Sequence, residues 1–427
     1  MTDHAASTGS LPVVPATARG ALPWVIWVVG TLTYLVAILG RSSLAGIGTD
    51  TVVRFSADSS TLALFATLQL AVYGGMQIPA GLLLDRFGAR LVLTAGMTVM
   101  AAGSVWLAFA PDAASAIGAR ALTGAGDAMV FPSVLRLLTL WFPAGRVPLL
   151  QQITAQAGQL GQILSVAVLA VGVRVVSWEA AFCALAVVFV VFAVVNGAVV
   201  RERGVTLHRR GASAGPGQFA LLGAAMREPG TRLAFWVHFV TPFAGTTVAL
   251  LWGVPFLIHG EGLASDDASL MITVYVLAGA VFAPLMGTLS GSYPRHRPAI
   301  AVVSVLAQAA TLGGILLWPG PAPIWLLIVW MVALSSGSAA SMIAFDVARR
   351  HNPVQRLSTA TGVVNMGGFI AALIAMYVIG LVLDLQHADP SSYTLDELRW
   401  AFGAIGVLWL VGLGGIAAES RRLRVRR

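Results

Sequence analysis

Arg41, Arg120 and Asp127 lie deep inside long apolar stretches of the sequence. A charge at the centre of a membrane helix costs about 2.5–3.5 kcal/mol on insertion scales, so each of these residues needs a physical reason to be there. A guanidinium stays charged and presents a planar fork that fits a carboxylate or a phosphate. A buried carboxyl group beside an arginine can exchange a proton, because burial favours the neutral acid while the positive charge favours the carboxylate. These residue types point to binding of an anion and exchange of a proton.

The spacing of these charges leaves their roles open. Asp127 follows Arg120 by seven residues, which puts both on one helical face, within about 20° and roughly 10 Å along the axis. Asp127 therefore either exchanges a proton or forms a fixed ion pair with Arg120. Arg41 lies past the midpoint of its stretch, so it either binds an anion or extends to the nearer membrane surface. Arg136 points about 160° away from Arg120, and we expect its side chain to extend to the inner surface.

A row of amide side chains follows on a later apolar stretch. Gln152, Gln156 and Gln159 recur at i, i+4 and i+7, which is the spacing of one helix face. We expect this face to point into the interior of a helix bundle. The amides either line a path for a polar molecule or hydrogen-bond neighbouring helices, and the sequence supports both interpretations equally.

The elements that carry these residues are predicted to be membrane-spanning helices. Of the 427 residues, 57% are hydrophobic and 10% are charged, whereas soluble domains contain about 25% charged residues. A helix needs about 20 apolar residues to cross the hydrocarbon core of a bilayer. The predicted fold class is therefore an all-α integral membrane protein. Twelve stretches have the required length, and they cover 22–47, 60–84, 89–109, 114–140, 148–173, 178–200, 232–258, 267–290, 298–318, 322–347, 356–384 and 399–418.

The basic residues indicate which side of the membrane each loop faces. All 26 basic residues are arginines. If the N-terminus lies inside, twenty of them fall in inner segments, and only Arg54, Arg174 and Arg399 fall in outer loops. This asymmetry follows the positive-inside rule, so we expect both termini in the cytoplasm. The net charge of +8 does not indicate nucleic-acid binding, because the arginines lie in short loops and form no basic stripe on a polar surface.

The sequence argues against a metalloenzyme and against an ATP-driven pump. Cys183 is the single cysteine, which excludes a disulfide framework or a cysteine metal site. The histidines do not cluster with acidic residues at ligand spacing, and no Walker loop is present. The first residues show no charged region, apolar core and cleavage site in succession, so we expect a flexible tail and no cleaved signal peptide. We expect no metal, no cofactor and no enzymatic activity.

The longest polar segment divides the chain into two similar parts. Residues 201–231 are rich in Gly, Ser and Pro, a composition typical of a linker. Segment 287–297 occupies the place of segment 81–90, 206 residues later, which favours an internal repeat over two unrelated membrane domains. The predicted domains are a flexible tail (1–21), a six-helix bundle (22–200), the cytoplasmic linker (201–231), a second six-helix bundle (232–418) and a basic tail (419–427).

Segment 81–90 reads Gly-Leu-Leu-Leu-Asp-Arg-Phe-Gly-Ala-Arg and joins two predicted spans. It resembles the signature loop between helices 2 and 3 of the major facilitator superfamily, with Ala89 in place of one usual basic residue. The resemblance implies that this loop closes the cytoplasmic side, with its aspartate against the amino end of a helix in the other half, where a carboxylate is favoured. The matching positions, which we expect to act in gating, are Gly81, Asp85, Arg86, Gly88 and Arg90.

Two further resemblances refine this prediction. Arg120 followed by Gly124 is similar to the fourth-helix motif of the superfamily. The residues around Arg41 resemble the first helix of its organic-anion and sugar-phosphate branch, in which an arginine before Leu-Ala or Phe-Ala binds the anionic group. That branch often adds a second arginine from the seventh helix, where this chain has Thr246 and Thr247. We therefore expect a monoanion, or a neutral solute held by hydroxyl groups, over a doubly charged phosphate.

Other motifs lead to the alternatives. Asn365, Gly367 and Gly368 resemble the motif of nitrate/nitrite porters, but the arginines that those porters bury in helices 2 and 8 are absent. Close packing at the glycines, with Asn365 bonding across helices, explains the motif as well. Drug–proton antiporters usually have a Gly-Pro pair in the fifth helix, and 148–173 has no such pair.

The leading prediction is a secondary active transporter that imports a small organic anion with a proton by alternating access. The alternatives are proton-driven efflux of drugs or metabolites, and nitrate/nitrite transport. The expected partners are the anion, protons and the lipid bilayer of a bacterial cell membrane, and the expected functional unit is a monomer. Asp127 and Arg120 are predicted to handle the proton. The predicted substrate-binding residues are Arg41, Gln156, Gln159, Tyr34, Tyr73, Asn365 and Thr246.

Overall fold

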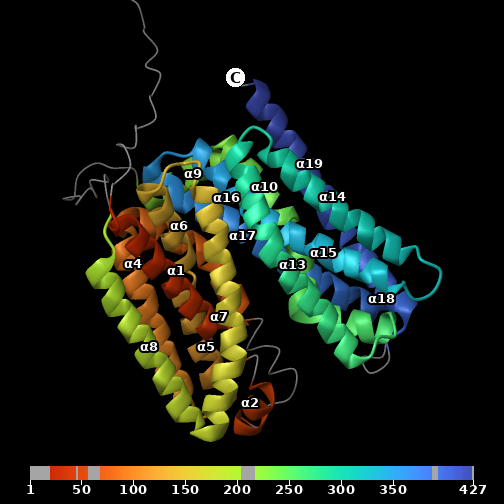
Figure 1. Ribbon diagram of the computed structural model, residues 1–427, viewed down its shortest axis with the longest axis horizontal. Helices are drawn as coiled ribbons and strands as arrows, with labels where there is room; N and C mark the ends of the chain where they lie inside the picture. Colours follow the sequence, from red (N-terminus) through yellow and green to blue (C-terminus); the bar gives the residue numbers. More distant parts are fainter. Residues whose placement is uncertain (1–19, 45–46, 56–67, 203–216, 387–392, 426–427) are drawn as a thin grey trace, which may run out of the picture.

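The computed structural model describes residues 20–44, 47–55, 68–202, 217–386 and 393–425, and every regular element in these ranges is a helix (Figure 1). Eleven helical stretches within them are long and apolar enough to cross a membrane. They run over Leu22–Arg41, Gln77–Ala108, Ala113–Trp141, Val147–Val175, Trp178–Val199, Pro229–Gly260, Ser265–Ser292, Arg297–Leu316, Ile324–His351, Val354–Leu385 and Leu395–Val425.

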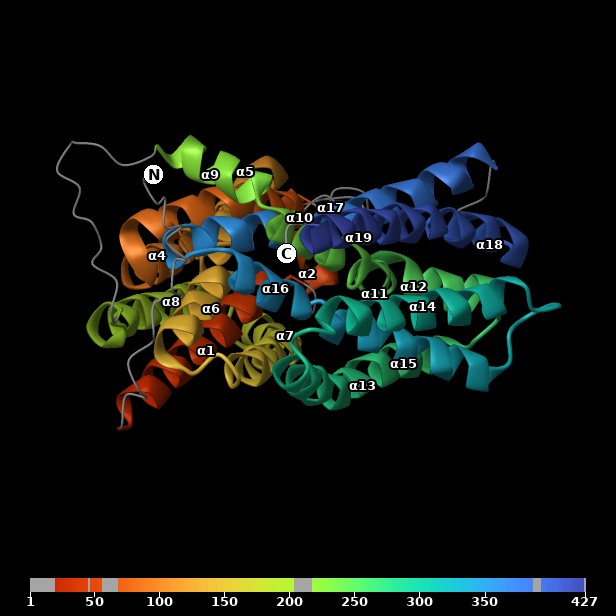
Figure 2. The same cartoon turned by 90° about the horizontal axis from the view of Figure 1, so that it is seen from above.

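The helices form two groups that lie side by side in both views (Figures 1 and 2). We call those before residue 203 the N-terminal helices and those after residue 216 the C-terminal helices. The N-terminal helices are α1 (Leu22–Arg41), α2 (Gly48–Phe55), α4 (Gln77–Ala108), α5 (Ala113–Asp127), α6 (Val130–Trp141), α7 (Val147–Val175) and α8 (Trp178–Val199).

The C-terminal helices begin with a short helix, α9 (Gln218–Arg227), and a segmented stretch from Pro229 to Gly260. That stretch consists of α10 (Pro229–Val240), α11 (Phe243–Thr247), α12 (Gly253–Pro255) and π-helical turns at Val248–Trp252 and Phe256–Gly260. The others are α13 (Ser265–Ser292), α14 (Arg297–Leu316), α15 (Ile324–Ala340), α16 (Ile343–His351), α17 (Val354–Leu385), α18 (Leu395–Ala404) and α19 (Gly406–Val425).

Several helices start at residues whose side chains accept hydrogen bonds from unpaired backbone N–H groups. Asp112 accepts the N–H of Ser115 at the start of α5, and Ser177 accepts the N–H of Ala180 at the start of α8. At α18, Thr394 and Glu397 form a reciprocal capping box. The sequence therefore determines these helix starts locally.

The predicted spans 60–84 and 89–109 meet at a sharp break inside α4. Gly88 has φ 80° and ψ 166° there, a conformation that residues with a side chain rarely adopt. The chain is helical over 68–75 and again from Gln77, and it turns at Gly88, while residues 60–67 lie outside the described ranges. The described residues contain eleven candidate spans, whereas the sequence predicts twelve. The difference arises because α4 joins the predicted spans 60–84 and 89–109 into one helical stretch.

Buried apolar side chains form two clusters. One lies within the N-terminal helices, and the other extends from the C-terminal helices to α6 and the start of α7. In lipid, where the hydrophobic effect does not drive helices together, close packing holds such clusters. Gly126 allows α5 to approach α4, since a Cβ added there would lie 2.6 Å from the carbonyl oxygen of Gly96. The largest fully buried side chains of the first cluster are Phe182, Phe189, Leu93 and Met97, and those of the second are Trp330, Phe243, Phe256 and Phe402.

The two groups meet through two pairs of long helices. α17 packs against α4, and α13 packs against α7. In Figure 1 the groups are close together near α16 and α17 and diverge toward the end where α2 lies. The close end contains Asp85, so we call it the Asp85 end.

Candidate functional site

Arg41 and Asp127 form an ion pair at the ends of two helices. Arg41 is the last residue of α1 and Asp127 the last residue of α5. Nε of Arg41 donates to Oδ2 of Asp127 at 2.5 Å, and the two side chains are 23% and 0% exposed. Arg41 thus points to a carboxylate and not to the membrane surface. The residues for which the sequence suggested separate roles lie in direct contact.

Arg120 is not the ion-pair partner of Asp127, because Arg41 takes that place. Its guanidinium donates to the carbonyl oxygens of Gly40 (3.2 Å) and Arg41 (2.6 Å), and to Oγ of Ser43 (2.7 Å). It also donates to the side-chain oxygen of Gln69. The last carbonyls of a helix have no partner within the helix. Arg120 satisfies those of α1 and thereby positions the end that carries Arg41.

Aromatic side chains lie beside the ion pair. The guanidinium of Arg41 stacks 4.0 Å from the ring centroid of Tyr73. That ring packs edge-on against Phe369 of α17, with centroids 4.8 Å apart. Tyr34, on α1, packs against Phe131 at 4.8 Å. These contacts connect the pair to both groups of helices, because Phe369 belongs to the C-terminal helices.

The ion pair retains hydrogen-bonding capacity. No group in the described residues hydrogen-bonds Nη2 of Arg41 or Oδ1 of Asp127, although both atoms are buried. Buried polar atoms are nearly always paired in proteins, because leaving them unpaired is costly. One donor and one acceptor are therefore available to a polar ligand. Across the described ranges, no group of three His, Cys, Asp or Glu side chains is placed to hold a metal ion.

Of the other predicted substrate-binding residues, Gln156 and Asn365 form hydrogen bonds between the two groups of helices, whereas within the described ranges Gln159 and Thr246 do not. Gln156 donates to the carbonyl oxygen of Gly279 on α13 at 2.9 Å, and Nδ2 of Asn365 donates to Oε1 of Gln77 at 2.7 Å. Both bonds cross between the two groups of helices. Gln159 is exposed, Thr246 is half-buried, and neither side chain has a hydrogen bond within the described part of the chain. The structure does not bring these two residues to the ion pair.

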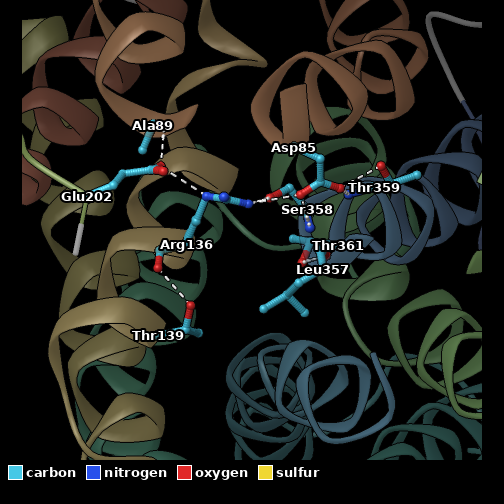
Figure 3. Close-up of polar contacts among 9 residues, drawn as sticks. All are labelled: Asp85, Ala89, Arg136, Thr139, Glu202, Leu357, Ser358, Thr359 and Thr361. Atoms are coloured by element: carbon cyan, nitrogen blue, oxygen red, sulfur yellow. Dashed lines mark hydrogen bonds and ion pairs between the residues drawn. The ribbon is translucent and has the colours of Figure 1, made fainter. Parts of the chain in front are cut away.

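Asp85 lies near the amino end of α17, against its fifth and sixth residues (Figure 3). Its Oδ1 accepts the N–H of Ser358 at 3.1 Å, and its Oδ2 accepts the N–H and the hydroxyl of Thr359, each at 2.7 Å. The amino end of a helix carries a partial positive charge, which favours a carboxylate nearby. A carboxylate from the N-terminal helices therefore holds the start of a C-terminal helix.

Arg136 is buried in the same network, so the expectation that it extends to the surface is wrong. The residue is 3% exposed. Nη1 donates to Oδ1 of Asp85 at 2.9 Å and to Oγ of Ser358 at 3.0 Å, and Nε donates to Oε1 of Glu202 at 3.0 Å. Two carboxylates hold this arginine inside, an arrangement that helical periodicity does not reveal. We call Asp85, Arg136, Glu202, Ser358 and Thr359 the Asp85 cluster.

Glu202 is the member of this cluster that sequence analysis missed. Its Oε1 also accepts the N–H of Ala89 at 2.5 Å, directly after the break at Gly88 (Figure 3). A Cβ added at Gly88 would lie 2.9 Å from Oε2 of Glu202. The available signal was one acid between Arg201 and Arg203, at the start of a segment interpreted as linker.

The remaining residues of the 81–90 motif differ in exposure. Gly81 allows α4 to touch α17, since a Cβ added there would lie 2.5 Å from the carbonyl oxygen of Ser358. Arg86 and Arg90 are exposed, and the Arg86 guanidinium lies 5.0 Å from the Phe87 ring centroid. The buried members of the motif make the contact between helices, and its arginines face outward.

Comparison with known proteins identifies the family of this chain. The family model described as Major Facilitator Superfamily matches residues 30–263 and 234–419. The chain is 21% identical over 398 residues to a probable sulfoacetate transporter of Cupriavidus necator, covering 89% of this chain and 91% of that protein. It is also 21% identical over 433 residues to a D-galactonate transporter of Escherichia coli, covering 93% and 98%.

A solved structure shows the same fold. It is a bacterial homologue of the human lysosomal transporter Spinster in an inward-facing, unoccupied conformation, with a TM-score of 0.61, 16% sequence identity and coverage of 94% of this chain and 97% of that one. At this identity the likeness concerns the fold alone. Because the superfamily model spans most of the sequence, including the segments that carry Arg41, Asp127 and the Asp85 cluster, the chain belongs to the major facilitator superfamily and is a multi-pass membrane transporter, not an enzyme.

Proposed function

We propose that the protein imports a small organic anion together with a proton. The observation that carries this proposal is the ion pair between Arg41 and the fully buried Asp127. The relatives whose printed names specify sulfoacetate and D-galactonate carry organic anions, which supports the substrate class. A single guanidinium at the pair favours a monoanion.

The proposed coupling follows from charge balance. An unpaired charge in a buried site is strongly unfavourable, so Arg41 needs an anionic partner in every state. Without substrate, that partner is the Asp127 carboxylate. When the anion binds Arg41, Asp127 takes up a proton and becomes neutral. One anion and one proton then cross together, and the site carries the same net charge with and without its cargo.

The proposed architecture is twelve spans in two six-helix units, with both termini inside. The arginine-rich loops support this orientation, and it puts the Asp85 end at the cytoplasm. The contacts of the Asp85 cluster with α17 then hold the inner side closed. Opening to the inside requires these bonds to break while the two units rock about the site.

Uptake by whole cells tests the proposal. Cells that express the protein should accumulate labelled D-galactonate, which is a monoanion, and an uncoupler should lower the accumulation. Arg41→Gln should abolish uptake at normal expression, whereas Arg54→Gln, at a half-exposed arginine in an outer ion pair, should not. Uptake that persists in Arg41→Gln would remove Arg41 from the site. Greater retention of a compound after uncoupling would indicate efflux.

The role of Asp127 has its own test. Asp127→Asn should retain exchange of labelled for unlabelled anion across proteoliposomes, because exchange needs no net proton movement. The same variant should lose accumulation against a gradient. Asp384→Asn, at an exposed aspartate of α17, serves as the control and should accumulate normally. Uphill accumulation by Asp127→Asn would rule out Asp127 as the coupling group.

A further inference from the structure

A groove at the Asp85 end lies outside the site described above. Its volume is about 660 Å³, and α9 forms one wall. Arg356, near the start of α17, lies on the other side. The lining therefore combines apolar groups with charged ones, and consists of Phe219, Ala220, Gly223, Ala224, Arg227, Glu228 and Arg356.

α9 has one apolar face that is exposed in the part of the chain that the structure describes. Phe219 is 86% exposed and Met226 is 51% exposed, and nothing lies within 4 Å of a Cβ built on Gly223 between them. These residues are spaced i, i+4 and i+7, so they share one face. The opposite face packs on α17 and α10. In Figure 2, α9 runs along the outer margin of the molecule. Such a face is typical of a helix in the plane of the membrane interface.

The charges of the groove are mainly positive. Arg227 is exposed and forms no ion pair with any described residue. Nη2 of Arg356 lies 3.4 Å from Oε2 of Glu228, and its Nε donates to Asn352 at 3.0 Å. The other oxygen of Glu228 accepts the N–H of Gly230 at 3.4 Å. The carboxylate is thus already engaged, and Arg227 is available for an anion.

We propose that this groove binds the headgroup of an anionic phospholipid of the inner leaflet. Arg227 and Arg356 would contact the phosphate, and the acyl chains would lie along Phe219 and Met226. A soluble anion would use the arginines but leave the apolar face uncovered, whereas a phospholipid matches both. The choice of leaflet rests on the proposed orientation of the transporter.

The position of the groove predicts an effect on the transport cycle. Arg356 precedes Ser358 by two residues, and the N–H of Ser358 binds Asp85. α9 also touches α4, so it lies over the contact between α4 and α17. A lipid bound between α9 and the first turn of α17 would hold both in the arrangement that binds Asp85. It would therefore favour the state with the inner side closed.

Binding is tested on purified full-length protein in neutral detergent. Phosphatidylglycerol should raise the melting temperature and phosphatidylcholine should not. Arg227→Gln should weaken the apparent affinity about fivefold, the contribution of one basic residue near an anionic surface, and Phe219→Ser should weaken it as well. Both positions are exposed, so folding should be retained. Arg146→Gln, at an exposed arginine elsewhere on the same end, should bind like the wild type.

Three results would overturn the lipid site. They are wild-type affinity in Arg227→Gln, an equal loss in Arg146→Gln, and equal protection by soluble glycerol 3-phosphate. None of these measurements depends on transport, so failure of the site is distinguishable from failure of the proposed function. In proteoliposomes, phosphatidylglycerol should slow maleimide labelling of Leu357→Cys, a position beside Ser358, in a Cys183→Ser background. This effect should be lost when Arg227→Gln is added.

Discussion

Arg41, Arg120 and Asp127 of the N-terminal helices contact different groups. Arg120 is occupied by the carbonyl oxygens at the end of α1. Asp127 is left to Arg41, which in turn stacks on Tyr73. A guanidinium with its fixed set of donors is well suited to cap several acceptors at once. Arg41 therefore pairs with one carboxylate, and Arg120 supports the end of α1 that carries Arg41.

Glu261 is a buried carboxyl group at the opposite end, just beyond the span Pro229–Gly260. It is 4% exposed, and its Oε2 accepts the N–H of Ala322 at 2.5 Å. Oε1 has no partner in the described residues. Burial raises the pKa of Glu261, while the hydrogen bond from Ala322 and the charge of Arg399 act in the opposite direction.

This shift predicts a pH-dependent stability. Because the folded protein binds the Glu261 proton more tightly than the unfolded chain, the stabilisation is complete below the unfolded pKa of about 4.3. It is lost as the pH rises through the higher folded pKa. Glu261→Gln should therefore lose less thermal stability than the wild type between pH 4 and neutrality. Glu179→Gln, at a half-exposed glutamate, should follow the wild type. A Glu261→Gln profile parallel to the wild type would contradict the prediction.

At the scale of elements, the break between α15 and α16 is met by Gln152, one member of the amide row of α7, and by its neighbour Gln151. Residues Ser341 and Met342 interrupt the helix, and a broken membrane helix needs outside partners for its backbone groups. Gln152 donates to the carbonyl oxygen of Ala339 at 2.7 Å, and Gln151 to that of Met342 at 2.8 Å. The N-terminal helices thus complete the backbone bonding of a C-terminal helix.

Gln152→Leu should destabilise the state in which the inner side is closed. A hydrogen bond contributes about 0.5–1.5 kcal/mol net, or roughly two- to tenfold in the closed-to-open ratio. The measurement is the rate of maleimide labelling of Leu357→Cys, a buried position beside Ser358, in a Cys183→Ser background. Labelling should speed up by that factor. Gln162→Leu, at an exposed position of α7, is the control. Equal rates for Gln152→Leu and the control would exclude this role.

At the scale of the whole molecule, two glycine contacts close the same end. A Cβ at Gly81 would collide with α17 at Ser358, and a Cβ at Gly287 would lie 2.9 Å from Cα of Leu149 on α7. The polar parts differ: Asp85 bonds across to α17, whereas Asp346 bonds to Arg349 and Ser290 within the C-terminal helices. The two contacts therefore resemble each other in packing and differ in charge.

Gly81→Val and Gly287→Val should each prevent closure of the inner side. The added side chain would meet backbone atoms, which cannot move aside without separating the helices. Uphill transport should be lost, and labelling of Leu357→Cys should become faster than in the parent. Gly313→Val in α14, where nothing lies within 4 Å of a Cβ, should transport normally. Normal transport by Gly287→Val would show that the α13–α7 contact is not needed for closure.

The helices could be predicted from the sequence where the signal is local. α8 runs over Trp178–Val199 and was expected over 178–200, because a long apolar run bounded by a capping serine defines it. The prediction that the Arg136 side chain extends to the surface is wrong. Helical periodicity gives the direction of a side chain but does not show which carboxylates bind it. Glu202 was missed for the same reason, since its partners Arg136 and Ala89 are distant in sequence.

The amino-acid sequence alone determined that this is an α-helical membrane transporter of the major facilitator superfamily, because apolar length and the 81–90 motif are properties of contiguous residues. Only the tertiary structure decided that Arg41 and Asp127 form one site, and that Arg120 supports it from the side. The physical reason is that an ion pair depends on the distance between two helices. That distance is set by packing between residues far apart along the chain, at glycines such as Gly126, and no local pattern encodes it.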